Sequence, residues 1–125
     1  MSKLVTFEQA KRLKELGCKL LTHAYYSFDE KLRFHTGIYD WNTYATENTY
    51  AVPTISEALE WFREVKGIHC SVILSDYFDG SVRYTGRYLL DVYGGWVERE
   101  TEYYYDNHSE AESALLDALI EYVSK

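Results

Sequence analysis

Residues 54–67 show the clearest helical periodicity in the chain. Thr54 followed by Glu57 three residues later has the pattern of a capping box, which predicts the start of a helix. Gly67 suits the left-handed conformation that ends many helices. The apolar positions between these ends have the spacing of one helix face, with Trp61 at its margin, and they are Ile55, Ala58, Leu59, Phe62 and Val65. The sequence therefore predicts a central helix with both ends encoded.

Two further segments repeat this pattern near the ends of the chain. Thr6 and Gln9 form a second capping box, and Gly17 follows as a stop signal. The short amphipathic helix between them is expected to bury Phe7, Ala10, Leu13 and Leu16. Ser109 and Glu112 predict a third capping box at the start of the last helix. That helix is expected to bury Ala111, Ala114, Leu115, Ala118, Leu119 and Tyr122.

Apolar and polar positions alternate between the central and last helices, which predicts an antiparallel meander of at least three strands. The first strand spans residues 68–75 and the second residues 82–93, with Gly94-Gly95 as a two-residue turn into the third. The second strand is expected to bury Val82, Tyr84, Tyr88, Leu90 and Val92. Because a meander of this size needs a cover, we expect the two helices on one of its faces.

The same pattern predicts how the strands pair. A three-residue loop, Asp79-Gly80-Ser81, sets Val72 opposite Tyr88 and keeps apolar side chains on one face, with the glycine in a positive-φ position. The turn at Gly94-Gly95 sets Arg87 opposite Glu102. The outer face of the resulting edge strand, where charge opposes edge-to-edge association, is expected to carry Glu98, Glu100 and Glu102.

Residues 18–52 are less regular. A strand is expected within residues 20–28, a turn at Asp29-Glu30-Lys31, and a return strand over residues 32–35. From Thr36 to Val52 the pattern gives way to aromatic residues among polar ones, which predicts a long loop. Such a loop either covers the fold or carries function, and the sequence leaves both readings open.

Together these elements predict one α+β domain spanning residues 1–125, in the order α-(ββ)-α-β-β-β-α. Its core is the α-β-β-β-α unit of residues 53–125, with an antiparallel meander of three or more strands and helices on one face. Residues 1–52 add an N-terminal helix, a hairpin and the aromatic loop. This length is enough to bury a core without disulfides or a metal ion.

Composition and charge narrow the function classes. The net charge is −7 and the sequence pI is near 5.0, so the surface should repel phosphate backbones, and no nucleic-acid partner is expected. Thirteen tyrosines suit half-buried sheet surfaces or protein interfaces. There is no signal-peptide pattern and no membrane-length apolar run. Two cysteines are too few for a disulfide framework, so a cytoplasmic location with no membrane partner is expected.

The order helix, three antiparallel strands, helix from Thr54 onward resembles the double-stranded-RNA-binding domain. Members of that family hold RNA through the first strand-to-strand loop and through basic residues at the start of the last helix. The corresponding stretches here are Tyr77-Phe78-Asp79-Gly80 and Asn107-His108-Ser109-Glu110-Ala111-Glu112, and neither contains lysine or arginine. The resemblance therefore implies the topology without the phosphate-binding chemistry.

A second resemblance covers most of the chain. Two stretches of the sequence are similar to small uncharacterised proteins of gut bacteria and their phages. They are VTFEQAKRLKELG at residues 5–17, and Ala51-Val52-Pro53-Thr54 leading into EALEWFREVKGIH at residues 57–69. The segment Tyr39-Asp40-Trp41-Asn42 fits the same group. The resemblance implies a phage or mobile-element origin and supplies no catalytic residue.

The residue types present would suit two kinds of chemical site, and the sequence favours neither. Cys18, His23, His69 and Cys70 are zinc-ligand types, but their spacing is loose, and adjacent strand residues such as His69 and Cys70 should point to opposite faces. The carboxylates Asp29, Asp40, Asp76, Asp79 and Asp91 offer material for a hydrolase, which needs two of them facing each other. No metal ion, cofactor or catalytic residue is expected.

A protein-binding surface is the remaining hypothesis. Its candidate residues are aromatic and rimmed by acidic residues, which would suit a basic partner or self-association, and they are Trp41, Tyr44, Tyr50, Trp61, Tyr103, Tyr104 and Tyr105. The competing reading is that these rings simply cover the sheet. We expect a non-enzymatic protein-interaction or accessory protein; the alternative is a small-molecule or carbohydrate-acting enzyme that uses surface carboxylates.

Overall fold

The computed structural model describes residues 3–44, 48–76, 82–92, 95–101 and 104–124. It is an α+β fold with two three-stranded antiparallel sheets, which confirms the predicted class and order of elements. The smaller sheet has the strand order β2-β1-β3 and the larger one β4-β5-β6. The elements are α1 (Phe7–Glu15), β1 (Thr22–Tyr26), β2 (Leu32–Tyr39), α2 (Trp41–Tyr44), β3 (Tyr50–Ala51), α3 (Ile55–Glu64), β4 (His69–Asp76), β5 (Val82–Val92), β6 (Gly95–Glu100) and α4 (His108–Val123).

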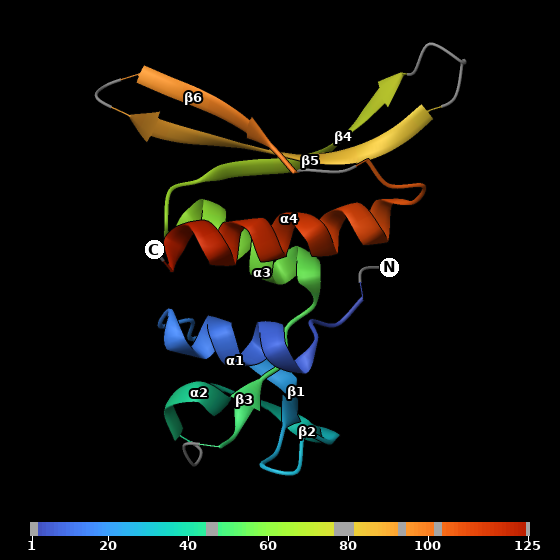
Figure 1. Ribbon diagram of the computed structural model, residues 1–125. Helices are drawn as coiled ribbons and strands as arrows, with labels where there is room; N and C mark the ends of the chain where they lie inside the picture. The colour runs from blue at the N-terminus through green and yellow to red at the C-terminus, as the bar shows by residue number, and fades with distance from the viewer. Residues whose placement is uncertain (1–2, 45–47, 77–81, 93–94, 102–103, 125) are drawn as a thin grey trace.

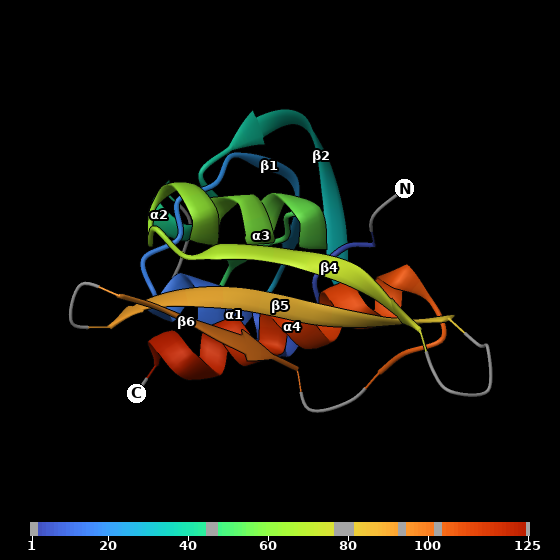
Figure 2. The same cartoon turned by 90° about the horizontal axis from the view of Figure 1, so that it is seen from above.

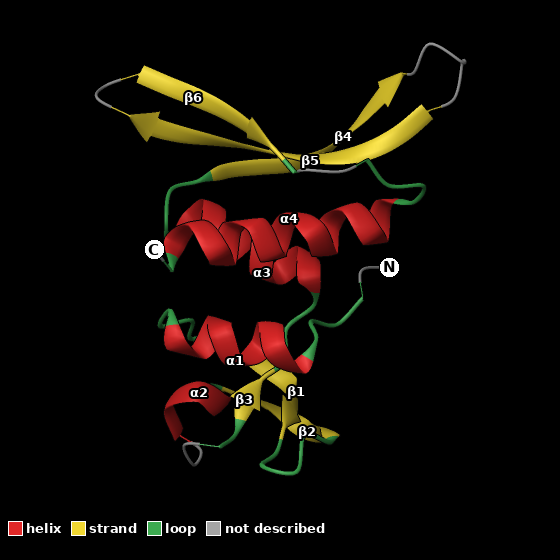
Figure 3. Ribbon diagram, in the orientation of Figure 1, coloured by secondary structure: helices red, strands yellow, loops and turns green. Residues whose placement is uncertain are grey.

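The elements stack in layers (Figure 1). The larger sheet lies over α3 and α4, α1 lies beneath these two helices, and the smaller sheet lies below α1. Figure 2 shows the larger sheet from its outer side, with the helices behind it. Figure 3 shows that helices separate the two sheets. The central and last helices therefore cover one face of the meander, as predicted.

Helix α4 is the centre of the core because it is buried on two sides. Leu115, Leu116 and Leu119 are fully buried, since α4 packs against β4 and β5 on one side and against α1 and α3 on the other. The sequence pattern foresaw only one of these faces. The prediction that Tyr122 is buried was wrong: its side chain is 41% exposed. The prediction that Val65 lies on the buried face of the central helix was also wrong. Its side chain is 61% exposed, because it follows the last residue of α3.

Two of the three predicted capping boxes are confirmed. The Thr6 and Thr54 hydroxyls each accept a hydrogen bond from the backbone N–H three residues later, and the side chains of Gln9 and Glu57 accept one from the backbone N–H of Thr6 and Thr54. The third prediction, Ser109 with Glu112, was wrong. Asn107 caps α4 instead, through a 2.9 Å hydrogen bond from the Glu110 backbone N–H. Glu112 is buried, and its carboxylate accepts a 3.0 Å hydrogen bond from the Ser56 hydroxyl on α3.

The strand pairings differ from those predicted by two residues. Val72 lies opposite Gly86 rather than Tyr88, and Arg87 lies opposite Glu100 rather than Glu102. A two-residue shift keeps every side chain on its face, so the hydrophobic pattern alone does not distinguish the two registers. Gly95 belongs to β6 rather than to the turn. The predicted loop at Asp79-Gly80-Ser81 and residue Glu102 lie outside the described residues.

In the N-terminal part, the predicted hairpin is confirmed, but the long loop after it was wrong in part. β2 continues to Tyr39 through an irregularity in its pairing with β1, and the short elements α2 and β3 follow. Asn42 ties this segment together. Its side-chain amide donates to the Cys18 carbonyl at 2.8 Å and accepts from the Ala51 N–H at 2.9 Å.

Candidate functional site: an exposed edge strand

The aromatic residues predicted to form a binding surface lie in different parts of the molecule. Trp61 is in the core, 6% exposed, with its ring edge-on to Phe62 at 5.0 Å. Tyr50 is half-buried and meets Phe7 edge-on at 5.5 Å, with the Lys14 ammonium 5.2 Å from its ring centre. These two rings therefore have packing roles, Trp61 on α3 and Tyr50 between β3 and α1.

The remaining candidates are divided between the two sheets. Trp41 lies at the smaller sheet, where its indole N–H donates to the Thr22 carbonyl at 2.8 Å. Tyr104 and Tyr105 follow β6 of the larger sheet. Tyr104 is 42% exposed, and Tyr105 pairs with Tyr84 through two backbone hydrogen bonds of 2.7 and 2.8 Å. Tyr103 and the side chain of Tyr44 lie outside the described residues.

Trp41 belongs to an aromatic group whose other members lie on β1 and β2. It stacks on Tyr25 with ring centres 4.2 Å apart, and it meets His35 and Tyr39 edge-on at 5.7 and 5.2 Å. His35 Nδ1 accepts a 2.9 Å hydrogen bond from the Gly37 backbone N–H. These contacts hold the second half of β2 in place, so the strand has a fixed conformation.

The exposed large apolar side chains of the described structure are concentrated between Phe28 and Tyr39, and we call this set of side chains the β2 patch. It comprises Phe28, Leu32, Phe34, Ile38 and Tyr39, with exposed fractions of 80%, 39%, 68%, 53% and 46%. Five of the eleven exposed large hydrophobic side chains in the described part of the chain thus fall within twelve residues. Sequence reasoning singled out only Tyr39 among them. The alternation of Leu32 and Phe34 was recognised as a strand, but it does not reveal which strand lacks a cover.

The position of β2 in the smaller sheet explains this exposure. Leu32 and Phe34 lie opposite Tyr26 and Ala24, so they share the sheet face that α1 covers. β2 is the outer strand of this sheet, and its principal contacts are with β1 alone (Figures 1 and 2). Helix α1 covers the middle of the sheet and leaves β2 beyond its edge.

The turn before β2 carries Asp29, Glu30 and Lys31, and β2 itself carries Arg33. Arg33 forms a 3.1 Å ion pair with Asp29, and β2 itself contains no carboxylate. A hydrogen bond from the Ser27 hydroxyl, helped by the Lys31 backbone N–H and by Arg33, lowers the pKa of Asp29. The patch therefore differs from the acidic average of the chain.

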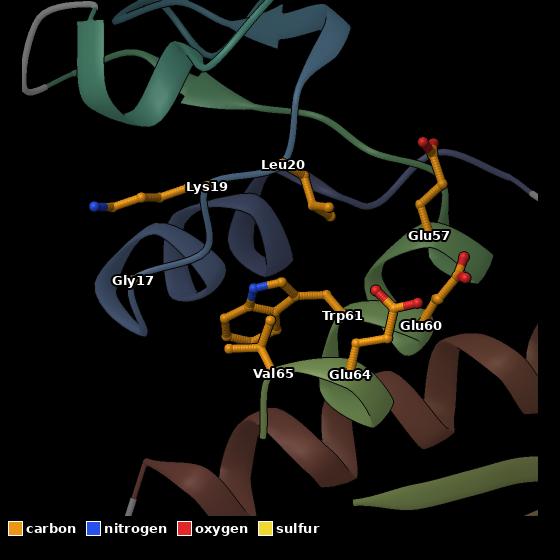
Figure 4. A pocket seen from close by; sticks show the side chains of 8 residues that line it. All are labelled: Gly17, Lys19, Leu20, Glu57, Glu60, Trp61, Glu64 and Val65. Carbon is orange, nitrogen blue, oxygen red and sulfur yellow. The ribbon is translucent and has the colours of Figure 1, made fainter. Parts of the chain in front are cut away.

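A second feature is a groove of about 430 Å³ between α3 and the segment that follows α1 (Figure 4). Leu20, Trp61 and Val65 supply its apolar part, and its charged lining consists of Lys19, Glu57, Glu60 and Glu64. The Glu57 carboxylate already accepts the Thr54 backbone N–H at 2.9 Å. Glu60 and Glu64 lie one turn apart on α3, and Figure 4 shows Lys19 pointing away from them.

Of the aspartates considered for hydrolysis, Asp29 and Asp40 have described side chains. Asp29 is paired with Arg33, and Asp40 accepts the Thr43 backbone N–H at 3.3 Å, so each has a local structural role. Neither lines the groove at α3. Asp79 lies outside the described residues, as do the side chains of Asp76 and Asp91.

Both cysteines are buried free thiols. Burial raises the pKa of Cys18 to about 11, and the nearby Asp40 carboxylate adds to this effect. Burial also raises the pKa of Cys70, whereas the Arg63 guanidinium acts in the opposite direction. Among the described residues, no three His, Cys, Asp or Glu side chains converge where they would hold a metal ion.

In comparisons with known proteins, no family model, curated protein or solved structure matches the chain. Within the described residues, no helix has the length and apolar character needed to cross a membrane. The functional argument therefore rests on the surface of the chain itself.

Proposed function

We propose that this chain is a small non-enzymatic interaction protein of the cytoplasm, of phage or mobile-element character, and that it binds protein through the β2 patch. The observation that carries the proposal is the exposure of five large apolar side chains on one edge strand and its turn. Scattered apolar side chains are normal on protein surfaces, but a gathered set marks an interaction site.

The size of the patch supports this reading. From typical side-chain areas, the exposed fractions correspond to roughly 500 Å² of apolar surface. The largest apolar patch on a monomeric protein is about 300–600 Å² and is often functional. The summed apolar exposure of the β2 patch is comparable in size, on a chain of only 125 residues.

The charge distribution favours a protein partner over a nucleic acid. The chain carries a net charge of −7, and the start of α4 carries Glu110 and Glu112 where double-stranded-RNA-binding domains use basic residues. A surface that repels phosphates lacks the electrostatic term on which nucleic-acid affinity depends.

The alternative of a carboxylate-dependent enzyme rests on the glutamates of the α3 groove. Glycoside hydrolysis requires two carboxylates that face each other across a substrate. Glu60 and Glu64 instead follow one another along a single helix, and Glu57 is engaged in the helix cap. The groove therefore supports this alternative less well than the β2 patch supports binding.

The proposal is tested by affinity purification from the native host, comparing the tagged wild type with Phe34→Glu. Leu74→Glu is the matched control, because Leu74 is also an apolar edge-strand residue and is 60% exposed, but on the larger sheet. We expect a defined protein to be retained by the wild type and the control and lost with Phe34→Glu. The same proteins retained by all three, or none retained by any, would refute the proposal.

A further inference from the structure

The free edge of β2 offers backbone groups as well as side chains. The Ser27 N–H donates to the Lys31 carbonyl at 3.2 Å, so this pair belongs to the hydrogen-bonded pairs of the β1–β2 ladder. Such pairs alternate along an antiparallel ladder, which directs the backbone groups of Arg33 toward β1. The N–H and C=O groups of Leu32 and Phe34 then point outward, where no further strand of the sheet is present among the described residues.

The other sheet edges carry features that oppose strand addition. β6 presents Glu98 and Glu100, and the N–H of Ala51 in β3 is taken by Asn42. At the start of β4, the Arg63 guanidinium donates to the Cys70 carbonyl at 3.0 Å. β2 combines outward backbone groups with the patch of exposed apolar side chains, which is the signature of an edge open to pairing.

We propose that two copies of this chain pair through their β2 strands, antiparallel and related by a two-fold axis at Phe34. The inference rests on the proposed binding role of the β2 patch and names its occupant. The two small sheets then form one continuous six-stranded sheet, and Phe34 of each copy lies beside its counterpart. The outward N–H and C=O groups of Phe34 in one copy then bond to those of Phe34 in the other, and Leu32 lies opposite Thr36.

Electrostatics selects this register. With the axis at Phe34, Arg33 lies opposite His35 of the second copy. Moving the axis to Arg33 sets two guanidinium groups against each other, and moving it to Leu32 sets Lys31 against Arg33; like charges directly opposite destabilise a strand pair. An axis at His35 would centre the strand pair beyond Phe34, which is the last residue of β2 in regular register with β1.

The available area suits a dimer of modest strength. The patch offers roughly 500 Å² of apolar side-chain surface per chain, and a stable interface buries about 800 Å² per partner. The paired backbone and the polar side chains of residues 31–36 add to the first figure. We therefore expect a concentration-dependent dimer rather than a permanent one.

Disulfide trapping tests the register. Cα atoms of a hydrogen-bonded antiparallel pair are about 5.5 Å apart, within the range a disulfide spans. Phe34→Cys should therefore give a covalent dimer under mild oxidation. Leu32→Cys is the matched control, because the two introduced thiols would be separated by about 13 Å along the strands. Cys18 and Cys70, 2% and 7% exposed, should stay unreacted in the folded chain.

Sedimentation velocity of the full chain tests the dimer itself. We expect a species of twice the 14.7 kDa chain mass to grow with concentration in the wild type and in Leu74→Glu, and to be lost in Phe34→Glu. Circular dichroism checks that all three are folded. If Phe34→Glu is not folded, Thr36→Pro replaces it, since proline removes the N–H that would face Leu32 of the second copy and is tolerated on edge strands.

A wild type that stays monomeric at all concentrations, or equal crosslinking of Phe34→Cys and Leu32→Cys, would overturn the dimer. The proposed function and the proposed dimer can be distinguished by experiment. If the wild type is monomeric but Phe34→Glu still abolishes capture of another protein, the patch binds that protein and self-association is refuted.

Discussion

Gly86, in the middle of β5, lies directly against Leu115 of α4. A Cβ atom placed on Gly86 would be 2.7 Å from the Leu115 Cβ and 2.9 Å from a methyl carbon of Thr101. Real Cβ contacts are not this short, so the glycine sets how closely the last helix approaches the sheet. Val72 lies opposite Gly86 across the β4–β5 ladder, so the observed register places this glycine at the centre of the meander.

Gly86→Ala should therefore destabilise the fold by overpacking, by about 1–3 kcal/mol. Urea unfolding followed by circular dichroism measures the change. The double variant Gly86→Ala with Leu115→Ala should cost less than the sum of the two single changes, because the smaller side chain makes room for the methyl group. Additive costs would show that the two residues do not compete for the same space.

The cap of α4 gives a second prediction. Asn107→Ala should lower the free energy of unfolding by about 1 kcal/mol, because it removes the acceptor for the Glu110 backbone N–H. Ser109→Ala, two residues further on, should change it by less than about 0.5 kcal/mol. Chemical denaturation of both variants decides between the observed cap and the one that the sequence pattern suggested.

The two tryptophans of α3 and β6 should respond differently to truncation. Trp61→Ala should cost about 3–5 kcal/mol, since the side chain is 6% exposed and its loss leaves a cavity. Trp96→Ala should stay within about 0.5 kcal/mol, because its side chain is 58% exposed. Equal effects in thermal unfolding would contradict the assignment of Trp61 to the core.

The buried Cys18 thiol makes stability depend on pH in the alkaline range. Its folded-state pKa of about 11 lies above the ordinary value of 9.0, so ionisation favours the unfolded chain. The contribution of this group is fully present below about pH 9 and is lost as the pH rises through about 11. We expect the urea midpoint to fall less steeply with pH in Cys18→Ala than in the wild type. Tyrosines also ionise in this pH range, but they contribute equally to both proteins. Parallel curves of urea midpoint against pH would show that the Cys18 thiol does not ionise on unfolding.

Much of the fold follows from short stretches of sequence. Thr6 with Gln9 and Thr54 with Glu57 mark helix starts that the structure retains, because a capping box is satisfied entirely within four residues. Gly17 and Gly67 take positive φ values of 86° and 68°, as their places after the helices predict. The alternation after Gly67 likewise identifies the meander strands, since each strand shows its buried face in its own residues.

The candidate site followed from the sequence far less well. Tyr39 and Trp41 were recognised as aromatic residues in an irregular segment, but Leu32 and Phe34 read as ordinary strand positions. Their exposure depends on α1, which covers β1 and leaves the neighbouring strand uncovered. Trp61 shows the reverse case, because a residue at the margin of the helical pattern becomes buried once other segments pack around α3.

The sequence by itself determined where α1 and α3 begin, which segments form the strands of the meander, and the acidic character of the chain. These properties depend on hydrogen bonds and spacings within a few residues. Only the tertiary structure decided the strand registers, the two-sided burial of α4 and the exposure of β2. A shift of two residues preserves every face, and burial depends on which distant element arrives as a cover, so neither is written in any single segment.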